Sequence, residues 1–181
     1  MLVRHGEAAA GWDADPDPGL SPLGRGQAES MADDLAPLGP LPVVASPLRR
    51  TRETAAALVA RWASEMRIEP GVGEIVAPAE QAGLEGRTAW LRTAMAGRWS
   101  DLGPEHLAWR QAVLDALRAI EDDAVVVTHF IAINVAVGEA SGDDRVVTFA
   151  PGHCSCTILG VEDGGRLVVV RLGQTASTRV L

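Results

Sequence analysis

The chain has 181 residues, a length typical of one domain, so we expect residues 1–181 to form a single domain. Its 16 basic and 24 acidic residues give a formal net charge of −8, which disfavours general binding to nucleic acid or to an anionic membrane surface. All 16 basic residues are arginines, which excludes P-loop, kinase and Schiff-base chemistry because each of these needs a lysine.

The sequence also indicates where the protein resides. No stretch approaches the roughly 18 apolar residues of a membrane span, and the N-terminus lacks the basic and apolar segments of a signal peptide. We therefore expect a cytoplasmic protein, and the arginine- and alanine-rich composition favours a bacterial source. The two cysteines, Cys154 and Cys156, are spaced to share one face of a strand, and we expect small core thiols rather than a disulfide or a zinc site.

Apolar patterning predicts an α/β fold. Three short apolar runs, each followed at once by polar residues, read as strands buried on both faces of a sheet: 2–3, 43–45 and 125–127. Between them, apolar residues at helical spacing predict helices that include residues 31–38, 55–62 and 113–120, the last beginning near residue 104. Strand and helix alternate, which is typical of a mainly parallel sheet covered by helices.

The rest of the chain adds elements to this frame. Helical patterns cover residues 90–99 and the segment after residue 129, and strand patterns cover 146–149, 157–161 and 167–172. The last two strands are joined by the turn 162–165 and predict a hairpin that adds an antiparallel edge to the sheet. Residues 69–86 are rich in turn formers, and we expect a functional loop there.

The residues after the buried strands form the candidate site. Ligands of open α/β sheets bind beyond the carboxyl ends of the strands, so Arg4-His5 and Thr128-His129 should meet at one edge. Arg50 should join them from the first turn of a helix beginning near Pro47, where exposed amides favour an anion. Two imidazoles and two guanidiniums in an acidic protein predict a compact anion as ligand, most simply a phosphate monoester.

Four motifs carry a resemblance to a known family. They occur in the order LVRHGE (2–7), LSPLGRGQAE (20–29), SPLRRTRETA (46–55) and VVTHF (126–130). Together they resemble the histidine phosphatase superfamily, the phosphoglycerate mutase-like group. The resemblance implies a three-layer α/β/α sandwich with a mainly parallel, mixed sheet.

The resemblance also implies a mechanism and the residues that perform it. His5 matches the nucleophile that attacks phosphorus and forms a phosphohistidine, which water then hydrolyses. Arg4, Arg50 and His129 match the residues that hold the phosphoryl oxygens. The adjacent guanidiniums favour the unprotonated imidazole that such an attack requires.

The sequence departs from the family pattern at two places. Family members take their general acid from the segment after the second helix, where Glu74 is the best positional match. The usual aromatic-Gly-x-Trp-x-Gly continuation is absent, so Glu80 and Glu85 remain alternatives. In addition, only Met1 precedes LVRHG, so either the first strand is short or the start codon is misplaced.

Other charged residues have simpler interpretations. We expect His106 to be a solvated or capping residue, His153 to be a structural residue near the rim of the site, and Arg49 and Arg52 to be helix-surface charges. No metal or other cofactor is expected, because the two-histidine spacing of a metalloprotease is missing and the arginines oppose a bound cation.

The preferred function is a metal-independent phosphomonoester hydrolase that acts on a small phosphorylated metabolite or a protein phosphohistidine. One alternative is a phosphoglycerate mutase, although mutases of the family usually carry longer insertions that keep water from the phosphoenzyme. A second alternative is a phosphate-binding module without turnover. The sequence predicts neither the substrate nor the oligomeric state.

Overall fold

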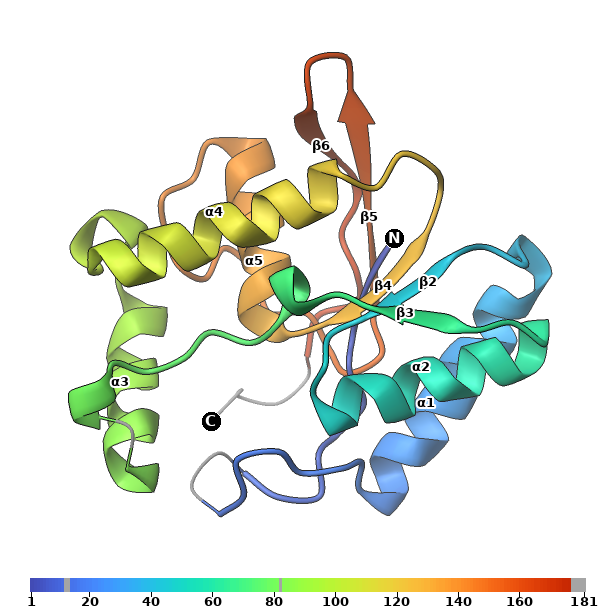
Figure 1. Ribbon diagram of the computed structural model, residues 1–181, viewed down its shortest axis with the longest axis horizontal. Coiled ribbons are helices and arrows are strands. Elements are labelled where there is room, and N and C mark those ends of the chain that lie inside the picture. The colour runs from blue at the N-terminus through green and yellow to red at the C-terminus, as the bar shows by residue number, and fades with distance from the viewer. Residues whose placement is uncertain (12–13, 82, 177–181) are drawn as a thin grey trace.

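The computed structural model describes residues 1–11, 14–81 and 83–176, with the backbone alone for residues 84 and 85. Its strands form one mixed sheet in the order β3-β2-β4-β1-β5-β6 (Figure 1). β3, β2, β4 and β1 run parallel, and β5 and β6 add an antiparallel edge. The strands are β1 (Leu2–Arg4), β2 (Val43–Ala45), β3 (Met66–Ile68), β4 (Val125–Thr128), β5 (Cys156–Glu162) and β6 (Arg166–Arg171).

Helices cover both faces of the sheet, which confirms the predicted three-layer α/β/α class (Figure 1). α1 and α2 pack together on one face, and α4 and α5 pack together on the other, with α3 on the α4 side. Among the described residues, no helix combines the length and apolar character needed to cross a bilayer. The α-helices are α1 (Pro22–Leu35), α2 (Arg49–Trp62), α3 (Leu84–Ala96), α4 (Pro104–Arg118) and α5 (Phe130–Ser141).

Alternation along the short strands builds two cores from one sheet. Leu2, Val44 and Val126 pack into the cluster under α3, α4 and α5, whereas their neighbours Val3 and Val127 pack into the cluster under α1 and α2. Since successive strand residues point to opposite faces, a run of branched aliphatic residues serves both clusters at once. This is why the central strands read as continuously apolar.

Residues 146–149 are not a strand, although their sequence predicted one. The buried amide of Asn134 on α5 takes the place of a partner strand, because its Oδ1 accepts hydrogen bonds from the backbone N–H groups of Thr148 (2.7 Å) and Phe149 (3.1 Å). The backbone N–H of Val146 donates to the carbonyl oxygen of Gly97. A side chain on α5 therefore accepts the backbone hydrogen bonds that a partner strand would otherwise accept from this segment.

Several other predicted boundaries were wrong. The edge strand β3 was not predicted, and the helix expected over residues 90–99 begins at Leu84, ends at Ala96 and is followed by a 3₁₀ turn, Trp99–Asp101. α2 begins at Arg49, so Pro47 precedes the helix instead of opening it. Cys154 lies before β5 with a positive φ of 55°, so it does not share a strand with Cys156, although both half-buried thiols contact the core under α1 and α2.

Candidate active site

Parallel pairing brings the candidate residues to one edge of the sheet. Arg4 at the end of β1 is in register with Thr128 at the end of β4, so His5 and His129 follow directly, and their ring centroids lie 5.3 Å apart. β2 ends beside β4, and the chain then enters α2, whose second residue is Arg50. The described side chains Arg4, His5, Arg50 and His129 are all buried at this edge.

His5 is held in one tautomer by the backbone. Its Nδ1 lies 2.7 Å from the carbonyl oxygen of Gly6, and because a carbonyl only accepts, Nδ1 carries the proton. Nε2 is then unprotonated, and its lone pair accepts a hydrogen bond from Nε of Arg50 at 3.3 Å. Burial, followed by the charges of Arg50 and Arg4, holds the pKa of His5 well below its usual value. The imidazole is therefore a neutral nucleophile in a cationic setting.

His129 is fully buried at the start of α5 and is oriented by a hydroxyl. Its Nε2 lies 2.7 Å from Oγ of Ser46, which also accepts a long hydrogen bond (3.4 Å) from the backbone N–H of Leu48. Nδ1 lies 3.4 Å from Nη2 of Arg50, and because a guanidinium only donates, Nδ1 is the acceptor and the ring proton lies on Nε2, which donates to Oγ of Ser46. Burial and then the charges of His5, Arg50 and Arg4 lower the pKa of His129 well below its ordinary value.

Arg50 lies at the centre of the cluster. Besides His5, its guanidinium lies 3.6 Å from Oε2 of Glu74 and 4.0 Å from Oδ1 of Asp17. Thr54, one turn along α2, accepts from the backbone N–H of Gly6 and donates to the backbone carbonyl of Arg50, so it ties the loop after β1 to the helix that carries Arg50.

Arg4 is the second buried guanidinium. Its Nη1 donates to the carbonyl oxygen of Pro151 at 2.9 Å, and its Cζ lies 5.2 Å from the ring centroid of Phe130. Its Nε has no acceptor among the described residues. Burial lowers the pKa of Arg4 to about 10, so it remains charged at neutral pH. A buried, charged donor with unused capacity suits an anionic ligand.

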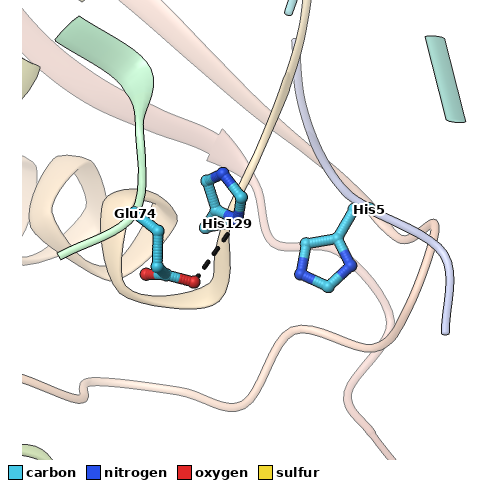
Figure 2. A group of neighbouring side chains, drawn as sticks. All are labelled: His5, Glu74 and His129. Atoms are coloured by element: carbon cyan, nitrogen blue, oxygen red, sulfur yellow. Dashed lines mark ion pairs between the residues drawn. The ribbon is translucent and has the colours of Figure 1, made fainter. Parts of the chain in front are cut away.

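Glu74 brings a carboxyl group to the same place from the irregular segment after β3. Figure 2 shows Glu74, His129 and His5 approaching a common space from three separate segments. Oε2 of Glu74 lies 3.3 Å from Nδ1 of His129, and its side chain is only 9% exposed. Burial raises the pKa of Glu74, although Arg50 opposes the effect. A carboxyl of raised pKa can hold and release a proton near neutral pH.

The two alternative acids do not join this cluster. Glu80 is exposed on a 3₁₀ turn, Ala79–Gln81, and the side chain of Glu85 lies outside the described residues. Among the described glutamates that follow the second helix, Glu74 is the one that contacts Arg50 and His129.

The remaining predicted residues fall in three places. His153 lies near the site, with its ring centroid 6.0 Å from that of His5. His106 is not solvated as predicted: it is buried, stacks on Trp90 and hydrogen bonds through Nε2 to the carbonyl of Val76. Arg49 is exposed and pairs with Glu53 at 2.6 Å, as expected of a helix-surface charge, and Arg52 is exposed on the same helix.

Sequence reasoning did not single out Ser46, Thr54 or Asp17 as site residues. Ser46 and Thr54 lie in the motif around Arg50, where hydroxyl residues are interspersed with arginines, and no local signal separates them from the other polar residues of 46–54. Asp17 accepts from the backbone N–H of Arg49 at 2.7 Å, and its position depends on the path of the loop after β1, which no local pattern reveals.

Two cavities open beside the cluster, and both are lined by Arg50 and Glu74. The first has a volume of about 410 Å³ and is also lined by Arg4, His5, His153 and apolar side chains of α3 and α5. The second, of about 370 Å³, lies between the start of α2 and the segment 70–76 and is also lined by Asp15, Arg87 and Trp109. Both volumes are in the range of small-molecule sites.

His5, Glu74 and His129 could in principle offer one ligand atom each to a metal ion, because these atoms all lie within 4.8 Å of one another. Two features of the cluster oppose a cation. Arg50 donates to the lone pair of His5 that a metal would need, and its guanidinium lies against the Glu74 carboxylate. The donors that face this space therefore suit an anion better.

Comparison with known proteins places the chain in a family. Residues 1–175 match the model of the histidine phosphatase superfamily (branch 1), and the protein belongs to that superfamily. Uncharacterized protein Rv0525 of Mycobacterium tuberculosis (strain ATCC 25618 / H37Rv) is 29% identical over 195 residues, with 97% of this chain and 96% of the relative covered.

Solved structures agree on the fold. Bacillus stearothermophilus YhfR superposes with a TM-score of 0.78 at 20% identity, covering 97% of this chain and 96% of that chain. Phosphoserine phosphatase from Entamoeba histolytica, in complex with 3-phosphoglyceric acid, gives 0.73 at 18% identity over 96% and 95%. The mycobacterial glucosyl-3-phosphoglycerate phosphatase Rv2419c, in complex with VO3, gives 0.70 at 21% identity over 96% and 98%.

Proposed function

We propose that this protein is a metal-independent phosphomonoesterase that works through a phosphohistidine at His5. The observation that carries the proposal is the tautomer of His5: a neutral ring presents an Nε2 lone pair, 3.3 Å from an arginine, into a space shared with Glu74 and His129. The substrate is a small phosphorylated metabolite or a protein phosphohistidine, and the net charge of −8 disfavours nucleic acid as a partner.

In the first step, the Nε2 lone pair of His5 attacks phosphorus and the bond to the leaving oxygen breaks. Glu74 donates its proton to that oxygen, so the alcohol leaves neutral. Arg4, Arg50 and His129 hold the non-bridging oxygens, whose charge the two guanidiniums stabilise during transfer. The phosphorylated ring is cationic, and the Gly6 carbonyl that accepts from Nδ1 stabilises this charge.

In the second step, water attacks the phosphohistidine. The Glu74 carboxylate takes a proton from that water, the N–P bond breaks, and its electron pair returns to Nε2. Without substrate, Glu74 contacts Arg50 and His129, the residues assigned to the phosphoryl oxygens. We therefore expect the phosphoryl group to displace the carboxyl toward the leaving oxygen.

The decisive experiment combines turnover with trapping of the intermediate. The wild-type protein should hydrolyse members of a phosphomonoester panel and, when quenched with a labelled substrate, retain label that is acid-labile and alkali-stable. His5→Ala should retain none and lose roughly 10⁴-fold or more in kcat/KM. Full activity of His5→Ala would overturn the proposal.

Neighbouring arginines on α2 supply a matched control. Arg50→Ala should lower kcat by about 10²–10³ because it removes a buried donor to the transferred group. Arg49→Ala should stay within about twofold of wild type, because that side chain is 62% exposed and pairs with Glu53.

The same assays test the other two functions that the sequence suggested. Faster isomerisation of phosphoglycerate than release of phosphate would make the protein a mutase. Binding of phosphate or vanadate with no turnover of any ester would make it a phosphate-binding module. Either result would replace the phosphatase proposal.

A further inference from the structure

The cavity into which His5 opens is largely apolar. Its walls come from three segments: residues 8–10 of the loop after β1, Leu91 and Met95 of α3, and Phe130 and Ile131 of α5. Leu91, Phe130 and Ile131 also belong to the buried core cluster on that face, and Met95 packs against it. The walls from α3 and α5 are therefore part of packed structure, whereas residues 8–10 form a loop in which Ala9 is exposed.

The charged groups that the described residues bring to this cavity offer no partner to a second anion. Among its described lining residues the cations are Arg4 and Arg50, and the proposed function assigns both to the phosphoryl group. His153 is neutral at pH 7, because burial and then the charge of Arg4 lower its pKa to about 4. The carboxyl group of Glu7 also lines the cavity and repels an anion.

The second cavity differs in this respect. Arg87 is among its described lining residues, so a carboxylate or a second phosphate placed there would meet an additional cation. His5 and Arg4, however, line the apolar cavity and are not among the described residues that line the second cavity. A substrate whose phosphorus is within reach of His5 therefore has the apolar cavity as its nearest space for the leaving group.

We propose that the substrates are phosphate monoesters of apolar, uncharged alcohols or phenols, and that Leu91, Met95 and Phe130 select them. This inference rests on the proposed function. A leaving group with a carboxylate or a second phosphate is rejected, because its charge would lose water without gaining a partner. Phosphoglycerate is then a poor substrate.

The test compares substrates that differ in one charge. With the wild-type protein, kcat/KM for 4-methylphenyl phosphate should exceed that for 4-carboxyphenyl phosphate by about tenfold or more, and 3-phosphoglycerate should be hydrolysed no faster than the carboxylated phenol ester. Equal rates, or a preference for the carboxylated substrates, would overturn the inference while leaving the phosphatase intact. Absence of any turnover would instead overturn the proposed function.

Variants locate the selectivity. Met95→Arg should raise the ratio of carboxyphenyl to methylphenyl turnover by roughly tenfold or more, because it adds a cation to the cavity. Met66→Arg, at a half-buried methionine on β3 that does not line the cavity, should leave the ratio unchanged. If Met95→Arg does not fold, Met95→Ala and Arg87→Ala decide which cavity holds the leaving group. Met95→Ala should change the rate for the methylphenyl ester. A loss confined to the carboxylated ester in Arg87→Ala would instead assign the leaving group to the second cavity.

Discussion

His5 and Glu74 share one buried cluster, yet burial has opposite effects on their proton affinities. It lowers the pKa of the imidazole and raises that of the carboxyl group, because in each case the neutral form is favoured. Burial therefore favours the unprotonated form of the nucleophile and the protonated form of the acid, the two forms that the first step of the proposed phosphoryl transfer uses.

The role of Glu74 predicts a dependence on the leaving group. Glu74→Gln keeps the size of the side chain but has no proton to transfer, so kcat for an alkyl phosphate should fall by about 10²–10⁴. For 4-nitrophenyl phosphate the loss should be much smaller, because nitrophenolate leaves without protonation. Steady-state assays of both esters measure this difference.

The pH profile gives an independent check of the same residue. Wild-type kcat for the alkyl ester should fall on the alkaline side, as Glu74 loses its proton at a pKa above its ordinary value of 4.5, and Glu74→Gln should lose that limb. Exposed Glu80→Gln is the matched control and should resemble wild type. Equal losses for both esters in Glu74→Gln would contradict the assignment of Glu74 as the acid.

At the scale of elements, a close contact between α1 and the loop after β1 fixes the position of His5. A Cβ added at Gly24 would lie 2.0 Å from the carbonyl oxygen of Glu7, and one added at Gly6 would lie 2.5 Å from the carbonyl oxygen of Gly24. The helix is further tied to the loop where Oε1 of Gln27 accepts from the backbone N–H of Glu7 at 2.8 Å. Backbone approaches backbone here, and no rotamer change relieves an added methyl group.

Two glycines on α1 therefore make a matched pair. Gly24→Ala should destabilise the protein by roughly 1–3 kcal/mol and lower kcat, because the helix must move away from the loop that carries His5. Gly26→Ala, with nothing within 4 Å of the added Cβ, should leave kcat unchanged and stabilise the helix by up to about 1 kcal/mol. Denaturant unfolding and steady-state assays measure both effects. Equal stability of the two variants would contradict the contact.

The elements that could be predicted from sequence are those whose pattern is decided by burial. β1, β2 and β4 are short, but each lies between two cores, so its apolar run is uninterrupted. β3 was not predicted because it is an edge strand. Its residues Arg67 and Ile68 are exposed, so it lacks an uninterrupted apolar run. Whether a strand can be predicted therefore depends on its position within the sheet, and the local sequence does not specify that position.

The same distinction applies to the site. Arg4, His5 and His129 could be brought together from sequence because they lie at the ends of the neighbouring parallel strands β1 and β4, and Arg50 because it lies in the first turn of α2. Glu74 comes from an irregular segment, where its proximity to Arg50 depends on tertiary contacts such as the hydrogen bond from Thr128 Oγ1 to the carbonyl of Val72. No periodic pattern encodes that contact.

At the scale of the whole molecule, an acidic chain of net charge −8 encloses a cationic site whose histidines are neutral. His5, His129 and His153 all have folded-state pKa values below the ordinary 6.5, so below pH 6.5 the unfolded chain binds protons that the folded chain does not. Their contribution to stability is present above pH 6.5 and is lost as the pH falls toward the folded-state values. Glu74 acts in the opposite sense, because its folded-state pKa is raised above 4.5. Its contribution to stability is lost as the pH rises from 4.5 to the folded-state pKa.

Three groups against one predict that the free energy of unfolding rises with pH between about 4.5 and 6.5, each net proton contributing about 1.4 kcal/mol per pH unit. Urea unfolding at a series of pH values measures this slope, and two variants change it in opposite directions. His5→Asn should flatten the slope, since it removes a proton taken up on unfolding, whereas Glu74→Gln should steepen it, since it removes the group that opposes the histidines. The half-buried carboxylate of Asp143, whose pKa is lowered to about 2 by Arg145, titrates below this window and does not affect the slope within it. A wild-type slope of zero would mean that these histidines are charged in the folded protein, and so would a slope that both variants shift in the same direction. A charged His5 has no lone pair with which to attack phosphorus.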